Sequence, residues 1–125
     1  MGYESKYFIV EKSGLAPNMD NGKIYAQFVA EFDMCKCYGL VDKIKNYPKT
    51  DCYFFDVDGN SEILFDNYGD ELTEIPIEDM TNFVYKEMQG DYKEYRRLKP
   101  FYSLLKSFVD DRNKWGNIIV LHFGY

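Results

Sequence analysis

The amino-acid sequence lacks any run of about 18 consecutive apolar residues, the length that a membrane-spanning helix requires. Its N-terminus also lacks the charged and then apolar segments of a secretory signal. It has three cysteines, Cys35, Cys37 and Cys52, and an odd number this small is not the disulfide framework of a secreted domain. We therefore expect a soluble, cytoplasmic protein.

Histidine is almost absent, because His122 is the only one. A Cys–His or Ser–His nucleophile system needs an imidazole base, and His122 lies between Leu121 and Phe123 in an apolar segment typical of a buried strand. Neither type of glycine-rich phosphate loop occurs. We expect no catalytic residues, no cofactor and no enzymatic activity.

Metal-binding patterns are incomplete. Cys35 and Cys37 would place two thiols on one side of a strand, but a structural zinc site usually has four cysteine or histidine ligands. Residues 56–62 carry oxygen ligands at alternate positions, as calcium loops do, yet Ser61 stands where such a loop has glycine and Asn67 where it has glutamate. The sequence predicts no metal site, and thiols that behave as small apolar side chains.

Basic side chains are missing from residues 50–85, which contain ten carboxylates and neither lysine nor arginine. The formal charge of the whole chain is −6, because the flanking segments carry fifteen basic and eleven acidic residues. Direct nucleic-acid binding needs a basic footprint, so this balance disfavours it. The acidic stretch indicates a solvated face, a surface that folds against the basic segment 93–99, or a binding surface for a basic partner.

The hydrophobic pattern predicts a single α+β domain over residues 1–125. We expect an antiparallel or mixed sheet of about five strands, with two or three helices packed on one face. The expected strands cover residues 3–11, 24–34, 52–57, 60–65 and 117–125, the last buried on both faces. The expected helices are a short connector at residues 40–47, a helix from Pro76 to Gly90, and a third helix that starts at Pro100.

Two local features of this pattern are specific enough to check. Residues 24–34 alternate strictly, which places Ala26, Phe28, Ala30 and Phe32 on one side of a half-buried strand. Asp58-Gly59 predicts a two-residue hairpin turn in which both residues have positive φ, with Phe54 opposite Ile63 and Phe55 opposite Glu62.

Several of the ten carboxylates have local roles, since Asp58 suits the turn and Glu78 and Asp79 suit a helix N-terminus. The remaining candidates for partner binding are Glu62, Asp66, Asp70, Glu71 and Glu74. An alternative protein interface has the tyrosine and arginine composition of a binding hot spot, at Tyr92, Tyr95, Arg96 and Arg97.

Four segments, MGYESKYFIVEKSG, IPIEDM, YRRLKPFYSLLK and NIIVLHFGY, give the chain a style that resembles small proteins of bacterial phages and prophages. Such phages carry acidic inhibitors of host defence, among them anti-CRISPR proteins that imitate nucleic acid. The resemblance implies a setting in the cytoplasm of a bacterial host and transfers no catalytic residue.

We therefore expect a non-enzymatic phage-type inhibitor whose acidic surface binds the basic groove of a host nucleic-acid-handling protein, such as a CRISPR effector. The alternative is a structural or regulatory phage protein that acts through the Tyr92 to Arg97 interface, with a homodimer as one form that it could take. A small enzyme or metal protein would instead need Cys35, Cys37, Cys52 or His122 to converge with acids in one cleft.

Overall fold

The computed structural model describes residues 5–14, 16–20, 22–34, 38–59, 61–66, 69–90 and 92–124, with the backbone alone at residues 34 and 38. The predicted cysteine pair Cys35 and Cys37 lies outside these residues, as do the first two residues of the predicted N-terminal strand and Asn67 of the calcium-like segment. The fold is α+β, as predicted, and six strands form one mixed sheet in the described part of the chain.

The strands are β1 (Ser5–Lys12), β2 (Ile24–Met34), β3 (Cys52–Phe55), β4 (Glu62–Ile63), β5 (Thr73–Pro76) and β6 (Asn117–Gly124). They lie in the order β4-β3-β2-β1-β6-β5, and all neighbours are antiparallel except the parallel pair β2 and β3. The helices are α1 (Tyr38–Ile44), α2 (Ile77–Gly90) and α3 (Tyr92–Asp110), and a short 3-10 helix covers Arg112–Lys114.

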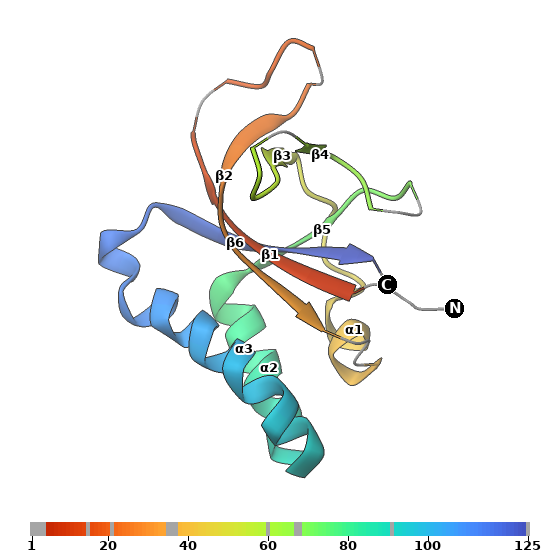
Figure 1. Ribbon diagram of the computed structural model, residues 1–125, viewed down its shortest axis with the longest axis vertical. Coiled ribbons are helices and arrows are strands. Elements are labelled where there is room, and N and C mark those ends of the chain that lie inside the picture. The colour runs from red at the N-terminus through yellow and green to blue at the C-terminus, as the bar shows by residue number, and fades with distance from the viewer. Residues whose placement is uncertain are drawn as a thin grey trace.

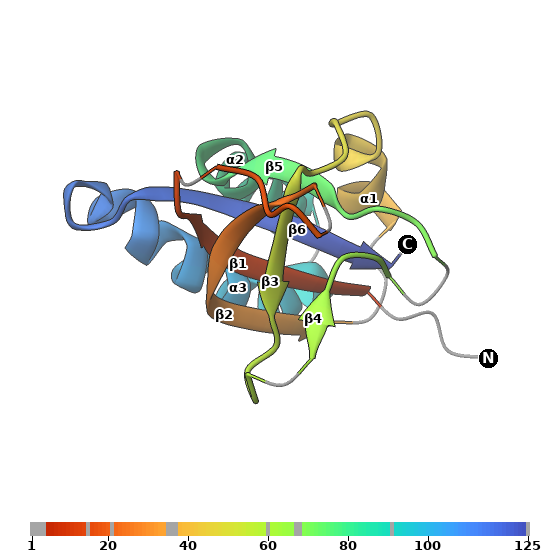
Figure 2. The same cartoon turned by 90° about the horizontal axis from the view of Figure 1, so that it is seen from above.

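The sheet separates two apolar clusters. On one face, Tyr7 of β1 packs against Phe101 of α3 with 5.0 Å between ring centroids, and buried side chains of all three helices join this cluster. On the other face, Phe8 of β1 packs against Phe54 of β3 at 4.8 Å. Helices α2 and α3 therefore cover one face, and β3 and β4 curl over the other (Figures 1 and 2).

Strand β6 is buried on both faces, as its apolar run predicts. Ile118 and Val120 face the helices, whereas Ile119 and Leu121 face the β3 side. Its position between β1 and β5 explains why almost every side chain along it is buried.

The predicted alternation of β2 is wrong beyond its middle, because a β-bulge lies there. Ile9 pairs with Ala30, but Val10 pairs with Phe28, so Val29 is an extra residue on β2. One inserted residue moves every following side chain to the opposite face. Phe28 consequently packs with the β3 cluster, whereas Ala30 packs with the helix cluster.

The β3–β4 hairpin has the predicted pairs, Phe54 with Ile63 and Phe55 with Glu62. Its turn is wider than predicted, because the Asp56 N–H donates to the carbonyl of Ser61 at 2.8 Å. Among the described residues only glycines have positive φ, so Gly59 adopts it (φ 73°) and the residue before it does not. The chain reverses through a longer loop than the two-residue type.

Two helix predictions need correction. Helix α1 is more than a connector, because Leu40 and Ile44 are fully buried. Helix α3 begins at Tyr92, and Pro100 lies inside it. Buried Leu98 continues the apolar stripe of Phe101 upstream of the proline, so tertiary packing outweighs the local cost of proline in a helix.

Candidate functional site

The acidic stretch folds into the β3–β4 hairpin, a turn at residues 66–70, strand β5 and the start of α2. The structure places the five predicted acidic residues in two environments: some carboxylates are accessible to solvent, and others pair with lysines of the same chain. Glu62 lies on β4, Asp66 and Asp70 on the following turn, Glu71 just after that turn and Glu74 in β5.

The turn at residues 66–70 is built by its own carboxylate. The Asp66 N–H donates to the Asp70 carbonyl at 2.9 Å, and the Asp66 carboxylate accepts the Asp70 N–H at 3.0 Å. Gly69, with φ of 82°, supplies the left-handed conformation that closes the turn. Asp70 and Glu62 have exposed side chains, and Asp66 is half-buried, so all three carboxylates are reachable from solvent on this edge.

Glu74 is a poor candidate for partner binding, because it already binds a lysine within the fold. The Lys12 ammonium lies 3.1 Å from the Glu74 carboxylate and 3.3 Å from that of Asp51, and the Lys12 side chain is only 21% exposed. Glu74 also accepts a hydrogen bond from the Thr50 hydroxyl at 2.8 Å. These contacts join β1, β5 and the segment before β3.

The electrostatics of this cluster follow from its burial and its pairing. Burial favours a neutral Lys12, but its hydrogen bond with Glu74 and the nearby negative charges outweigh burial and raise the pKa of Lys12. Burial likewise favours neutral Asp51, but the Lys12 charge and hydrogen bond outweigh it and lower the pKa of Asp51. The cluster is therefore a stabilising ion-pair network that spans the strands.

The same cluster contains the nearest approach to a metal site among the described residues, since ligand atoms of Asp51, Cys52 and Glu74 lie within 4.8 Å of one another. Lys12 competes for this position as the cation. Burial is the main cause that raises the pKa of the Cys52 thiol to about 11, and a protonated thiol is a weak ligand. This donor set suits a lysine better than a metal ion.

Two further acids of the stretch pair with cations from other segments. Lys23 lies 3.4 Å from Glu71, and Arg112 lies 3.6 Å from Glu78. The cations that neutralise part of the stretch thus come from β1, the segment before β2 and the 3-10 helix. Residues 93–99, the basic segment considered from the sequence, contribute no cation to these four ion pairs.

We call the β3–β4 hairpin and the turn at residues 66–70, with Glu62, Asp66 and Asp70, the acidic edge. This edge also exposes apolar side chains, which the charge pattern of the sequence did not indicate. Val57 is 74% exposed, Phe65 is 48% exposed and Phe55 is 37% exposed. All three belong to the hairpin and the residues directly after it. In the sequence, the sign of this exposure was Val57, because an apolar residue in the predicted turn segment cannot reach the core. Exposed apolar groups rimmed by polar residues are typical of a protein-binding surface.

The alternative interface lies at the start of α3. Tyr92 is 74% exposed and Tyr95 is 45% exposed, and the Arg96 guanidinium lies 5.9 Å from the centroid of the Tyr92 ring. Arg97 is half-buried and pairs with Glu94 at 3.3 Å. This end of the helical hairpin points away from the sheet and lies at the bottom of Figure 1, whereas β3 and β4 lie in the upper half.

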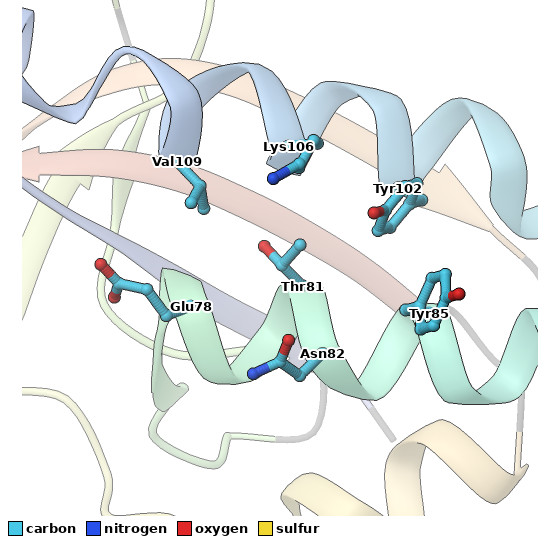
Figure 3. Close-up of a pocket in the computed structure, with 7 residues that line it drawn as sticks. All are labelled: Glu78, Thr81, Asn82, Tyr85, Tyr102, Lys106 and Val109. Carbon is cyan, nitrogen blue, oxygen red and sulfur yellow. The ribbon is translucent and has the colours of Figure 1, made fainter.

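A shallow groove of about 350 Å³ runs between α2 and α3 on their outer side (Figure 3). Tyr85 and Tyr102 face each other across it with 5.6 Å between ring centroids. Its charged groups are engaged, because Lys106 lies 3.0 Å from Asp110 and Glu78 pairs with Arg112. The groove adds aromatic surface to the helical layer.

His122 is buried in the sheet, as expected from its apolar neighbours. It is 6% exposed, it stacks on Tyr7 at 4.9 Å between ring centroids, and its Nε2 lies 3.0 Å from the Ser5 hydroxyl oxygen. Ser5 is 2% exposed, so its hydroxyl is buried beside the imidazole. The Ser5–His122 contact fits a satisfied core histidine.

Comparison of the chain with protein-family models, with curated proteins and with solved structures gives no match. No helix within the described residues is long and apolar enough to cross a membrane.

Proposed function

We propose that the protein is a non-enzymatic, phage-type inhibitor that acts in the bacterial cytoplasm. Its acidic edge binds the basic groove of a host nucleic-acid-handling protein, with a CRISPR effector as the specific candidate. The observation that carries the proposal is an edge where carboxylates of Glu62, Asp66 and Asp70 are interleaved with exposed Val57 and Phe65. Charge without apolar groups would suit a merely solvated face.

The number of carboxylates on this edge sets how far it can imitate nucleic acid. Duplex DNA carries one charge per about 1.7 Å of axis, so the ten carboxylates of the stretch would match about 17 Å. Those of Asp51, Glu71, Glu74 and Glu78 form ion pairs within the fold. Asp79 accepts a hydrogen bond from the Tyr47 hydroxyl at 2.8 Å. The other five carboxylates lie on the hairpin and its following turn, at residues 56, 58, 62, 66 and 70, and they match about 8.5 Å of duplex.

A footprint this short supplies steering and register more than affinity. The exposed side chains of Val57, Phe65 and Phe55 supply the apolar contact that phosphate mimicry lacks. The partner therefore needs a basic groove with an apolar recess beside it, and the inhibitor would exclude nucleic acid by occupying that groove.

The test is to capture the partner from bacterial host lysate and then to measure its affinity with purified components. The triple variant Glu62→Gln, Asp66→Asn, Asp70→Asn keeps the side-chain shapes, and the amide introduced at position 66 retains an oxygen that can accept the turn hydrogen bond. We expect it to bind at least about 10-fold more weakly, and we expect wild-type binding to weaken steeply with salt.

The matched control is the triple variant Asp42→Asn, Asp110→Asn, Asp111→Asn, which removes the same charge from exposed positions elsewhere. It should bind the partner within about twofold of the wild type, because distant charges are screened. Equal affinity of the two triple variants, or a partner that still binds nucleic acid when saturated, would refute the acidic-edge mechanism.

The Tyr92 to Arg97 interface provides the second candidate function, a structural or regulatory phage protein. Its support is the exposure of Tyr92 and Tyr95 and the stacking of Arg96 on Tyr92. Under this alternative, Tyr95→Ala and Arg96→Ala would weaken partner binding while the acidic triple variant would not.

A further inference from the structure

Strand β2 has an outer edge that β3 covers only at its start. On the inner side, β2 pairs with β1 along its whole length, whereas on the outer side it pairs with β3 at Ile24 and Tyr25 alone. Figure 2 shows β2 curving away from β3 beyond this start. Among the described residues no other strand pairs with the outer side of β2, so its second half is an edge of the sheet.

The hydrogen-bond pattern shows which backbone groups this edge presents. The Ser13 N–H donates to the Tyr25 carbonyl at 3.1 Å, so the odd-numbered residues of β1 direct their backbone groups at β2. Phe32 lies opposite one of them. Its neighbours Glu31 and Asp33 therefore direct their N–H and C=O groups outward. In the part of the chain that the structure describes, no strand or turn pairs with these outward groups.

The two sides of this edge differ in chemistry. Ala30 and Phe32 pack against the helix cluster but are only half-buried, so the helices leave part of their apolar surface uncovered. Glu31 and Asp33 alternate with them and extend to the opposite side of the sheet. On that side the Lys6 ammonium lies 3.7 Å from the Glu31 carboxylate.

The two carboxylates repel each other although a lysine lies beside them. Burial is the main cause that raises the pKa of Glu31, and the hydrogen bond and charge of Asp33 raise it further, whereas the Lys6 charge lowers it. A second cation would relieve this repulsion. Charged side chains also protect sheet edges from chance pairing. Here, however, they accompany outward backbone groups and partly uncovered apolar side chains, and together these three features match a strand of defined composition.

We propose that the second half of β2 binds an extended, basic segment of a partner protein as an added antiparallel strand. The segment has lysine or arginine opposite Glu31 and Asp33 and an apolar residue opposite Phe32, and its main chain continues the sheet. This docking surface goes beyond the proposed inhibitor function, because it lies outside the acidic edge.

Antiparallel pairing uses the backbone and the charges of β2 together. Two opposite residues of a hydrogen-bonded antiparallel pair exchange both backbone hydrogen bonds and extend their side chains to the same side. A lysine opposite Glu31 would thus bind the backbone of β2 and also its carboxylate. A second copy of β2 would instead place Glu31 opposite Asp33, and like charges in this position are destabilising. The charge pattern therefore favours a basic strand over a second copy.

The probe for the test is the peptide acetyl-Thr-Val-Lys-Val-Lys-Val-Thr-amide, titrated into the full chain labelled with ¹⁵N. Because the contact is short, we expect a dissociation constant between about 10 μM and 1 mM from the chemical-shift changes. Amide hydrogens of Glu31 and Asp33 should exchange rapidly in the free protein and at least about fivefold more slowly with saturating peptide. The Phe32 amide, which faces β1, should exchange slowly in both states.

Two methylated peptides separate strand pairing from attraction between charges. Methylation of both lysine backbone nitrogens removes the N–H groups that face β2, and it should weaken binding at least about 10-fold. Methylation of two valine backbone nitrogens places the methyl groups on the outer side of the added strand. This second peptide has the same charge and should bind within about threefold of the unmodified peptide.

Two protein variants test which carboxylates recognise the peptide. The double variant Glu31→Gln, Asp33→Asn should bind it at least about 10-fold more weakly. The matched control Glu62→Gln, Asp66→Asn removes the same charge from the acidic edge and should bind it within about twofold of the wild type. Circular dichroism should show that both variants are folded.

Several outcomes overturn the inference: no chemical-shift change at about 5 mM peptide, equal affinity of the two methylated peptides, or equal weakening in the two double variants. Unchanged amide exchange at Glu31 and Asp33 on binding also overturns it. Slow exchange there in a free protein that self-associates would identify a second copy as the occupant. Capture of a partner that depends on the acidic edge supports the proposed function whether or not the peptide binds, so the two proposals fail separately.

Discussion

Replacing Lys12 by Met should remove the strongest internal link of the acidic stretch. The ammonium lies 3.1 Å from Glu74 and 3.3 Å from Asp51, and methionine fills the same space without charge. Glu74 would keep only its hydrogen bond from Thr50. The substitution therefore leaves a half-buried carboxylate without its cation.

The expected loss follows from the exposure of the partners. Exposed ion pairs contribute about 0–1 kcal/mol, and breaking a fully buried pair costs about 3–5 kcal/mol. The Lys12 and Glu74 side chains are 21% and 23% exposed, so we expect the free energy of unfolding to fall by about 1–3 kcal/mol. For 125 residues, at about 2.1 cal/mol/K each, the melting temperature should fall by about 4–12 °C.

Urea unfolding followed by fluorescence measures this loss, because Trp115 is the only tryptophan and packs on Phe108 at 5.0 Å between ring centroids. Lys45→Met is the matched control. The Lys45 side chain is 61% exposed and lies 3.5 Å from Asp42, so this variant should lose no more than about 0.5 kcal/mol.

The directions of two pKa shifts determine how the stability loss of Lys12→Met should vary with pH. The pKa of Asp51 is lowered in the fold, so its contribution is present above its unfolded pKa and is lost as pH falls through the folded one. The pKa of Lys12 is raised, so its contribution is present below its unfolded pKa and is lost as pH rises through the folded one. The deficit of Lys12→Met should be largest between these limits and should shrink at both extremes.

The reasoning is refuted if Lys12→Met and Lys45→Met lose equal stability. It is also refuted if the double variant Lys12→Met, Glu74→Gln loses the full sum of the two single losses, because contacting charges should show a coupling energy of about 0.5 kcal/mol or more.

Other predictions test the helical layer and the buried thiol. Leu98→Ala should lower the free energy of unfolding by about 2–5 kcal/mol in a urea titration, because Leu98 is fully buried upstream of the proline. The control Tyr92→Ala, at an exposed position, should change it by less than about 0.5 kcal/mol. Equal losses in the two variants would contradict the extended α3. Pro100→Ala restores an N–H to the helix interior and should raise the free energy of unfolding by about 1–2 kcal/mol in the same assay, and no gain would contradict a helical Pro100. The Cys52 thiol, whose pKa is raised to about 11, should resist iodoacetamide at pH 8 in the folded protein and should react in urea. Peptide mass mapping measures the modification. Rapid reaction of Cys52 in the folded protein would contradict its burial.

The sequence predicts those elements whose signal is carried by their own residues. The apolar density of β1 and β6, the hairpin around Gly59 and the helix after Pro76 all lie where the pattern places them. Strand β5 was missed because Thr73–Pro76 is four residues long, too short for its alternation to be distinguished from a loop. The bulge at Val29 depends on pairing with β1, which no local pattern records.

The candidate site was predictable as a charge count but not as a surface. The absence of basic residues from the stretch is visible in the sequence, whereas the pairing of Glu74 with Lys12 joins positions 62 residues apart. Likewise, the ion pair between Lys23 and Glu71 joins positions 48 residues apart. Which acids face a partner is decided by this tertiary pairing.

Pro100 has a consequence for how the first part of α3 moves. Proline provides no N–H for the carbonyl of Arg96, so the helix lacks one backbone hydrogen bond at this position. Upstream of it, Leu98 is the only fully buried side chain of α3. The two turns before the proline can therefore open and exchange their amide hydrogens without unfolding the turns after it. A ligand bound to these turns would slow that exchange. Slower amide exchange at residues 96–99 would therefore indicate binding even if exchange in the rest of the helix did not change.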